Sequence, residues 1–337
     1  MKRLVVLPLL WWAVARAEDP VCTLTTNGEY GESNQSAFLP EHADHWDPAH
    51  APQEGIEYFV INGKSLYTPY VPDAGSLGAD VVFGGDKLTL GDDSSAGYLY
   101  NQTYAVVRIP RLTVVNGVYY SCGAWTGNRY SYLDSETTIT ATDWAKASFQ
   151  TGAKWQSFFL RGKLIGDTTA KMRMMNVSDV AATMGLASDC SEYFGAFVAN
   201  PQSWVSGAQN FYLDTTYFPG TLLLGGASPV SDTGSTFEFH VYATNGCAVS
   251  SLALNRTMRL HLNFDAATWE LDPVVVEDKF EGNCALTICP KAIGGDPIER
   301  QGGFGATFVP ILKVRKTAGE IDMSKISLGT IEGLTRT

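Results

Sequence analysis

Three Asn-Gly pairs, each between two β-prone runs, constrain the fold of this chain more than any other feature. They are Asn62-Gly63, Asn116-Gly117 and Asn245-Gly246. Asn-Gly provides the positive φ angles that a two-residue type I′ turn requires. Each pair therefore predicts an antiparallel hairpin, and Asn27-Gly28 is a weaker fourth example.

Signals for helices are sparse. Thr142 can cap a short helix over Asp143–Gln150, and Ser178 can cap another that ends at Gly185. The chain has 33 glycines and 15 prolines among many short apolar runs, which is typical of β-sandwiches and barrels. The sequence predicts an all-β fold, mainly antiparallel hairpins of the sandwich or barrel type, with one or two short helices.

The length of 337 residues fits either two β domains or one large one. The glycine-punctuated stretch from Asp143 to Gly152 is the predicted junction, which gives domains over 18–142 and 143–337. A single domain over 18–337 is the alternative. No internal repeat of fixed period is visible, and this argues against a regular propeller.

The first 17 residues have the layout of a secretory signal peptide. Lys2 and Arg3 precede an apolar run from Leu4 to Val14, and Ala15-Arg16-Ala17 has the small-x-small pattern of a cleavage site before Glu18. Eleven apolar residues are too few for a membrane helix, which needs about 20. We therefore expect a secreted protein, in the extracellular space or the lumen of the secretory pathway.

The charge of the chain excludes one class of partner. The formal net charge is −11 at pH 7, and it becomes −14 once Lys2, Arg3 and Arg16 leave with the signal peptide. An acidic protein repels nucleic acid and anionic membrane surfaces. We expect no nucleic-acid partner and, since no later apolar run has the length of a span, no membrane insertion.

Export also bears on the cysteines and the sequons. An even number of cysteines in an oxidising compartment predicts disulfides, here three, with 15 connectivities open. The cysteines are Cys22, Cys122, Cys190, Cys247, Cys284 and Cys289. Asn-x-Ser/Thr sequons predict glycosylation, at some sites rather than all. The sequons begin at Asn34, Asn101, Asn176 and Asn255.

Alternation around the third Asn-Gly pair predicts a polar sheet face. In a meander of three strands, Phe239 and Val241 would face the core and a polar set would face outward. The polar set is Glu238, His240, Tyr242, Arg259, His261 and Asp265. Glu238, His240 and Asp265 are the candidate acid/base groups, and a solvated face with cross-strand ion pairs is the simpler interpretation. His240 and His261 are expected two strands apart, about 9.6 Å, which is too far for one small metal ion.

Adjacent aromatic residues are a further feature. Neighbouring residues of a strand face opposite ways, so one ring of each pair leaves a one-sided core. The pairs are Tyr119-Tyr120, Phe158-Phe159, Phe211-Tyr212 and Tyr217-Phe218. Such rings either pack between layers or line a pocket for a sugar or an apolar molecule. The candidate ligand-binding residues are Trp125, Tyr130, Tyr132, Tyr242 and Arg259.

A histidine-rich segment lies near the N-terminus. Glu41–Asp47 together with His50 contains three of the five histidines, among acidic residues. Imidazoles and carboxylates can hold a metal, but prolines on both sides favour a surface loop. We therefore predict neither a metal nor a cofactor.

One short segment resembles a known family. Asp232-Thr233-Gly234-Ser235 is similar to the catalytic tetrapeptide of pepsin-like aspartic proteases, and Asp73-Ala74-Gly75-Ser76 and Ile293-Gly294-Gly295-Asp296 resemble a first copy and a late segment. The resemblance implies that Asp73 and Asp232 share a proton. The sequence departs from that family at two points: Pro72 and Ser231 stand where the family has an apolar strand, and the first copy has alanine for threonine.

The common catalytic motifs are missing from the sequence. It has no G-x-S-x-G, no H-E-x-x-H, no P-loop and no G-x-G-x-x-G after a strand. We therefore expect a protein that binds an uncharged ligand, a glycan or an apolar small molecule, in an aromatic-lined cleft, with or without acid/base chemistry. The alternatives are a structural glycoprotein of a cell surface or matrix, and a divergent aspartic-protease-like protein.

Overall fold

The computed structural model describes most of the chain between Val21 and Asp322. The described residues are 21–28, 36–70, 80–102, 106–121, 129–152, 156–177, 182–200, 207–229, 237–243, 245–265, 270–272, 274–282, 286–291, 312–314 and 321–322. The predicted signal peptide lies outside them and stays a prediction.

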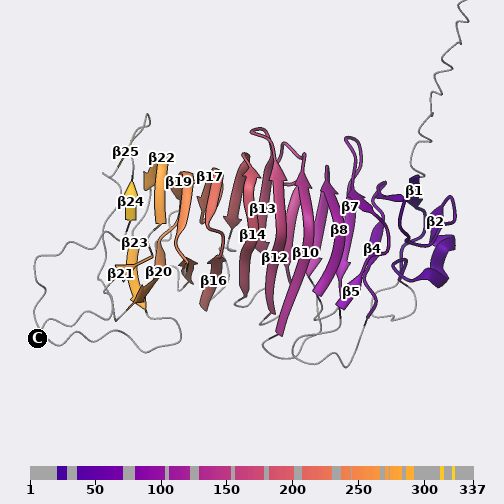
Figure 1. Cartoon of the computed structure of the whole chain (residues 1–337), viewed down its shortest axis with the longest axis horizontal. Helices are drawn as coiled ribbons and strands as arrows, with labels where there is room; N and C mark the ends of the chain where they lie inside the picture. The colour runs from indigo at the N-terminus through magenta and orange to yellow at the C-terminus, as the bar shows by residue number, and fades with distance from the viewer. Residues whose placement is uncertain are drawn as a thin grey trace, which may run out of the picture.

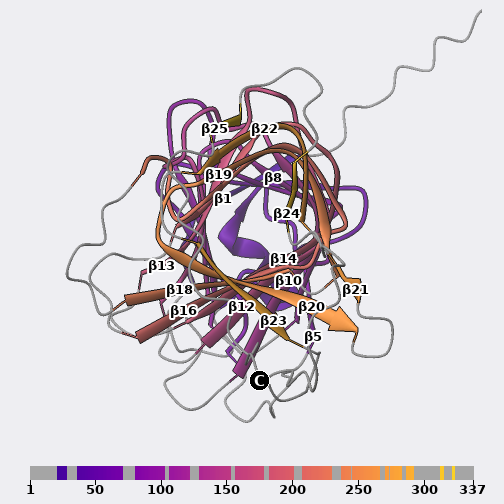
Figure 2. The same ribbon diagram turned by 90° about the vertical axis from the view of Figure 1, so that its left-hand side faces the viewer.

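The chain winds into a β-solenoid in which successive coils add strands to two long sheets (Figure 1). The strands follow one another along the molecule from β1 at one end to β22 and β24 at the other. Viewed along this axis, the coils lie over one another around a common interior (Figure 2).

The first sheet has 14 strands. Its main path is β2 (Trp46–Asp47), β1 (Val21–Leu24), β3 (Glu57–Val60), β6 (Lys87–Leu90), β8 (Val106–Val114), β10 (Arg129–Ile139), β12 (Gln156–Gly166), β14 (Thr183–Tyr193), β16 (Gly207–Leu213), β18 (Phe237–Ala243), β20 (Met258–Asp265) and β21 (Glu270–Leu271). Two strands lie off this path: β5 (Asp80–Val82) pairs with β8, and β23 (Leu286–Lys291) pairs with β20.

The second sheet has 11 strands. Its main path is β4 (Ser65–Tyr67), β7 (Gly97–Asn101), β9 (Gly117–Ser121), β11 (Ala147–Thr151), β13 (Lys171–Asn176), β15 (Ala196–Asn200), β17 (Tyr217–Leu224), β19 (Cys247–Leu254), β22 (Val274–Gly282) and β24 (Leu312–Val314). The remaining strand, β25 (Ile321–Asp322), pairs with β22.

The pairing of the strands corrects the expected architecture. Among the described pairs, only β1 with β2 and β20 with β21 are antiparallel, and the long strands pair in parallel, as β10 does with β12. The all-β class is confirmed, but the antiparallel sandwich or barrel is wrong. An alternating pattern tells which face of a strand is buried, and it is the same for parallel and antiparallel neighbours.

The Asn-Gly pairs lie at bends between strands but form no hairpins. Asn62 and Gly63 have φ angles of 57° and 71°, as a type I′ turn requires. Their turn joins β3 of the first sheet to β4 of the second, and each strand then bonds to the next coil, β3 to β6 and β4 to β7. Asn116-Gly117 and Asn245-Gly246 also lie between strands of different sheets. The turn chemistry fixes the bend but leaves the hydrogen-bond partner open.

The helix predictions are wrong where the structure describes them. The described part of the chain has a single helix, the 3-10 helix η1 (Pro40–His45). The segment after Thr142 forms a turn and then strand β11, and Thr183 and Met184 begin strand β14. No described helix is long and apolar enough to cross a membrane.

The coils differ in length, which explains why no repeat is visible in the sequence. Residues that face each other on adjacent strands are 27 positions apart for Tyr132 and Phe159, but 19 apart for Tyr242 and His261. Both sheets also run without a break across the predicted junction, because β10 pairs with β12 and β11 with β13.

Strand residues alternate between the interior and the outside over much of the solenoid, and the interior aliphatic and aromatic side chains build one apolar core. Each fully buried aliphatic or aromatic side chain contributes about 1.5–3 kcal/mol through loss of exposed apolar surface. One interior row runs along the second sheet through Leu66, Leu99, Tyr119, Phe149, Met174, Ala199, Leu224 and Leu254.

A buried polar row lies beside this apolar row. Asn101, Ser121, Thr151 and Asn176 occupy matching positions on successive strands, and all are fully buried. Asn101 Nδ2 donates to Ser131 Oγ at 2.6 Å, and Asn176 Nδ2 donates to the side-chain oxygen Oε1 of Gln209 at 2.8 Å. These bonds offset the cost of removing the amides from water.

Candidate functional site

The outer face of the first sheet carries a row of aromatic side chains that crosses six strands. We call this set the aromatic row: Tyr132, Phe159, Gly185, Tyr212, Tyr242 and His261, each paired in register with the next. At about 4.8 Å per strand, the row is about 24 Å long. The row arises because parallel, in-register pairing brings equivalent outward positions of successive coils together.

The rings of the aromatic row stack on one another. The ring centroids of Tyr212 and Tyr242 are 4.6 Å apart, and those of Tyr242 and His261 are 4.3 Å apart, with interplanar angles of 11° in both pairs. Tyr132 and Phe159 are stacked at 5.6 Å. Since each ring covers the face of its neighbour, ring edges and hydroxyl groups make up most of the exposed surface.

Gly185 interrupts the row but not the contact. Phe159 lies over it, and the centroids of Phe159 and Tyr212 are 5.8 Å apart across the gap. A Cβ atom at Gly185 would lie 2.2 Å from Cδ1 of Phe159. The missing side chain is therefore what allows the two rings to meet.

A second row on the same face consists of hydrogen-bonding side chains. This polar row contains Tyr130, Ser157, Thr183, Asn210, His240 and Arg259, again paired in register from strand to strand. Tyr130 is the most exposed of the tyrosines on this face at 44 %, and it stacks on Tyr132 at 6.3 Å. Apolar rings and hydrogen-bonding groups thus lie two residues apart along each strand.

One end of the two rows carries a chain of hydrogen-bonded titratable groups. Nε2 of His240 is 2.9 Å from Oε2 of Glu238, and Nδ1 of His240 is 2.9 Å from Nε2 of His261. The bond from His240 lowers the pKa of the Glu238 carboxyl. The expected separation of His240 and His261 by two strands is wrong, because β18 and β20 are adjacent and parallel.

The other end of the rows carries ion pairs. Arg108 Nη1 is 2.7 Å from Asp134 Oδ2, and Arg161 Nη2 is 3.6 Å from the same oxygen. The Arg161 guanidinium also lies 4.1 Å from the ring centroid of Tyr132, a cation–π arrangement. Burial raises the pKa of Tyr132, so its hydroxyl stays protonated at neutral pH.

Most of the predicted site residues lie on this one face. Tyr130, Tyr132, Tyr242, Arg259, Glu238 and His240 are all part of it. Asp265 ends strand β20, but its side chain lies outside the description, and Trp125 lies outside the described residues. Phe159 and Tyr212 were not among the candidate site residues, and their signal in the sequence is membership of the adjacent pairs Phe158-Phe159 and Phe211-Tyr212.

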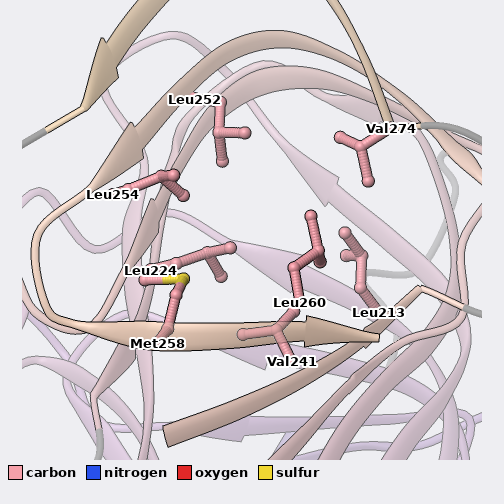
Figure 3. A pocket seen from close by; sticks show the side chains of 8 residues that line it. All are labelled: Leu213, Leu224, Val241, Leu252, Leu254, Met258, Leu260 and Val274. Atoms are coloured by element: carbon pink, nitrogen blue, oxygen red, sulfur yellow. The ribbon is translucent and has the colours of Figure 1, made fainter. Parts of the chain in front are cut away.

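One cavity enclosed by described residues lies away from this face. It has a volume of about 10 Å³, room for about one water, and lies inside the coil (Figure 3). Only aliphatic and methionine side chains line it: Leu213, Leu224, Val241, Leu252, Leu254, Met258, Leu260 and Val274. No residue of the aromatic row or polar row lines it.

The described cysteines form no disulfide, contrary to the expectation of three bridges. Cys22, Cys190 and Cys247 are buried free thiols. Cys190 lies on β14 of the first sheet and Cys247 on β19 of the second, and no disulfide joins the described cysteines. Cys122 and Cys284 lie outside the described residues, as does the side chain of Cys289.

The sequons divide into two groups. The side chains of Asn101 and Asn176 are 0 % exposed and that of Asn255 is 3 % exposed. Asn255 Nδ2 donates to the Gly226 carbonyl at 2.9 Å. A glycan on these amides has no room in the folded coil, whereas Asn34 lies outside the described residues.

Asp73 and Asp232 also lie outside the described residues, so the protease-like pair stays a prediction.

Comparison of the chain with protein-family models, with curated proteins and with solved structures finds no match.

Proposed function

We propose that this chain is exported and binds an uncharged glycan chain along the outer face of its first sheet. The observation that carries the proposal is the aromatic row beside the polar row, in register across six strands. A sugar presents apolar C–H groups and hydroxyls together, and the two rows offer partners for both.

The shape of the face favours an extended ligand over a small one. Small-molecule sites are concave and enclose most of their ligand, but these rows form an open strip about 24 Å long. A chain of linked sugars can contact successive strands at a repeating interval. We therefore propose an open strip in place of the expected cleft. Tyr130, at 44 % exposure, is the ring best placed for face-on stacking on a sugar.

The electrostatics favour a neutral ligand. The guanidinium groups of Arg108 and Arg161 already face Asp134, and Glu238 faces His240. The formal net charge of −11 repels polyanions at long range.

The alternative role, a self-assembling structural protein, receives less support from the N-terminal end of the solenoid. The edge strand of the first sheet there, β2, has two residues, and η1 leads directly into it. Short edge strands hinder the addition of strands from another molecule.

A panel of neutral and anionic polysaccharides, measured by titration calorimetry, tests the proposal. We expect a neutral chain to bind, and Tyr130→Ala to weaken it up to about tenfold, since a ring contact is worth about 0.5–1.5 kcal/mol. Tyr217→Ala is the matched control, because Tyr217 is 40 % exposed on β17 of the second sheet. Equal losses in both variants, or binding of anionic chains alone, would contradict the proposal.

Acid/base chemistry on the bound glycan is a second candidate, favoured by the chain of Glu238, His240 and His261. A carboxylate bonded to an imidazole orients the ring and stabilises its protonated form. If the bound chain is cleaved, Glu238→Gln should abolish the release of reducing ends and leave binding intact. Release at the wild-type rate in that variant would remove this role.

A further inference from the structure

The histidine-rich segment forms a compact cluster at the N-terminal end of the solenoid. It belongs to η1, beside β2 at the indigo end of Figure 1. His42, Asp44 and His45 each offer one potential ligand atom, and these atoms all lie within 4.8 Å of one another. The two imidazole rings are 4.9 Å apart, with an interplanar angle of 35°.

The backbone at this cluster is held in place. The His45 carbonyl accepts hydrogen bonds from Thr25 N at 2.8 Å, Thr25 Oγ1 at 2.9 Å and Thr26 N at 3.3 Å. The next residue, Trp46, is 2 % exposed and donates from its indole nitrogen to the Ala37 carbonyl at 3.0 Å. The ligand atoms are therefore presented from a fixed segment.

The His45 side chain is buried without a complete set of hydrogen bonds. It is 8 % exposed, and its Nδ1 atom has no hydrogen-bond partner among the described residues. A buried polar nitrogen without a partner costs free energy.

We propose that His42, Asp44 and His45 bind a divalent zinc-type ion at the N-terminal cap. Two imidazole nitrogens and one carboxylate oxygen are a common zinc donor set, whereas calcium and magnesium prefer oxygen ligands. Ligands about 2.0–2.1 Å from a tetrahedral ion lie about 3.4 Å apart, so modest side-chain rotation closes the cluster. Asp44 is exposed and His42 half-buried, which leaves the remaining coordination position open to water.

The ion would stabilise the conformation of η1 itself. The three donors lie within four consecutive residues of η1, and β2, which follows, is the last strand of the first sheet at this end. The site is remote in sequence and sheet position from the aromatic row, so its test does not depend on glycan binding.

Zinc and cobalt binding to the full mature chain, without an affinity tag, test the proposal. We expect one equivalent of Zn²⁺ to bind and to raise Tm, because a ligand that binds only the folded state stabilises it. Co²⁺ in the same site should give the visible absorption of a coordinated ion, while Mg²⁺ should leave Tm unchanged.

Substitutions separate this cluster from other metal-binding groups. His42→Ala and Asp44→Asn, both outside the core, should weaken Zn²⁺ binding by more than about tenfold. His50→Ala is the control, since His50 is an exposed histidine in the same segment outside the cluster. Zinc binding that is absent in the wild type, or undiminished in both cluster variants, would overturn the proposal.

Discussion

Nδ1 of His240 and Nε2 of His261 lie 2.9 Å apart, on adjacent parallel strands of the first sheet. One of the two nitrogens must donate and the other accept, and the opposite nitrogen of His240 faces the Glu238 carboxylate. The register of the coils thus brings three titratable side chains into one hydrogen-bonded chain.

The first prediction concerns the pH dependence of this chain. His240 holds the pKa of Glu238 below its ordinary value, so the stabilisation is present above the unfolded pKa of about 4.3 and is lost as the pH falls through the folded pKa. Carboxyl NMR titration should show a lowered pKa for Glu238. The effect on stability should be small, since the Glu238 side chain is 55 % exposed.

His240→Ala is the decisive comparison for this titration. Removal of the hydrogen bond should return the Glu238 pKa toward the ordinary range. A carboxyl that titrates identically in the wild type and in His240→Ala would show that another group causes the shift.

The second prediction concerns the gap in the aromatic row. Gly185→Ala should destabilise the protein by about 1–3 kcal/mol, as an overpacked position does, because its Cβ would lie 2.2 Å from a ring carbon of Phe159. Denaturant unfolding measures the change. In the Phe159→Ala background the same substitution should cost much less, and equal costs in both backgrounds would exclude the contact as the cause.

The sequence predicts local features of this molecule well and long-range pairing poorly. Asn62-Gly63 forms the type I′ turn that its composition indicates, and Phe239 and Val241 face the core while His240 faces out. These features depend on neighbouring residues. The parallel order of the strands depends on contacts between residues about 19 to 30 positions apart, which alternation does not encode.

In the candidate site, too, the residues of one strand were predictable and the pairing between strands was not. Glu238, His240 and Tyr242 are alternate residues of one strand, so the sequence places them together. Tyr130 and Tyr132 join them only through the register of β10, β12, β14, β16 and β18. Unequal coil lengths hide that register, so Phe159 and Tyr212, which complete the row, could not be identified from spacing.

The third prediction concerns the thiols. Burial raises the pKa of both Cys190 and Cys247 to about 12, so only about one thiol in ten thousand is ionised at pH 8. In native protein both residues should resist maleimide labelling, and in denaturant without reductant both should react. Peptide mapping identifies the labelled sites. Rapid native labelling, or a bridged cysteine at either position after unfolding, would contradict the structure.

The last prediction concerns glycosylation. Asn176 is fully buried, and its Nδ2 atom donates to Gln209 Oε1 at 2.8 Å. A glycan on this amide would remove the donor and would have to pass through the coil wall, so a glycosylated chain could not complete its core. Folded protein secreted from a eukaryotic host should therefore carry glycan at Asn34 and none at Asn101, Asn176 or Asn255. Site-resolved mass spectrometry measures the occupancy, and Asn176→Ala gives the control: it should cost about 1–3 kcal/mol by leaving Gln209 without this partner, without changing the glycan mass. Glycan at any of the three buried asparagines in folded protein would contradict the burial of these side chains in the structure.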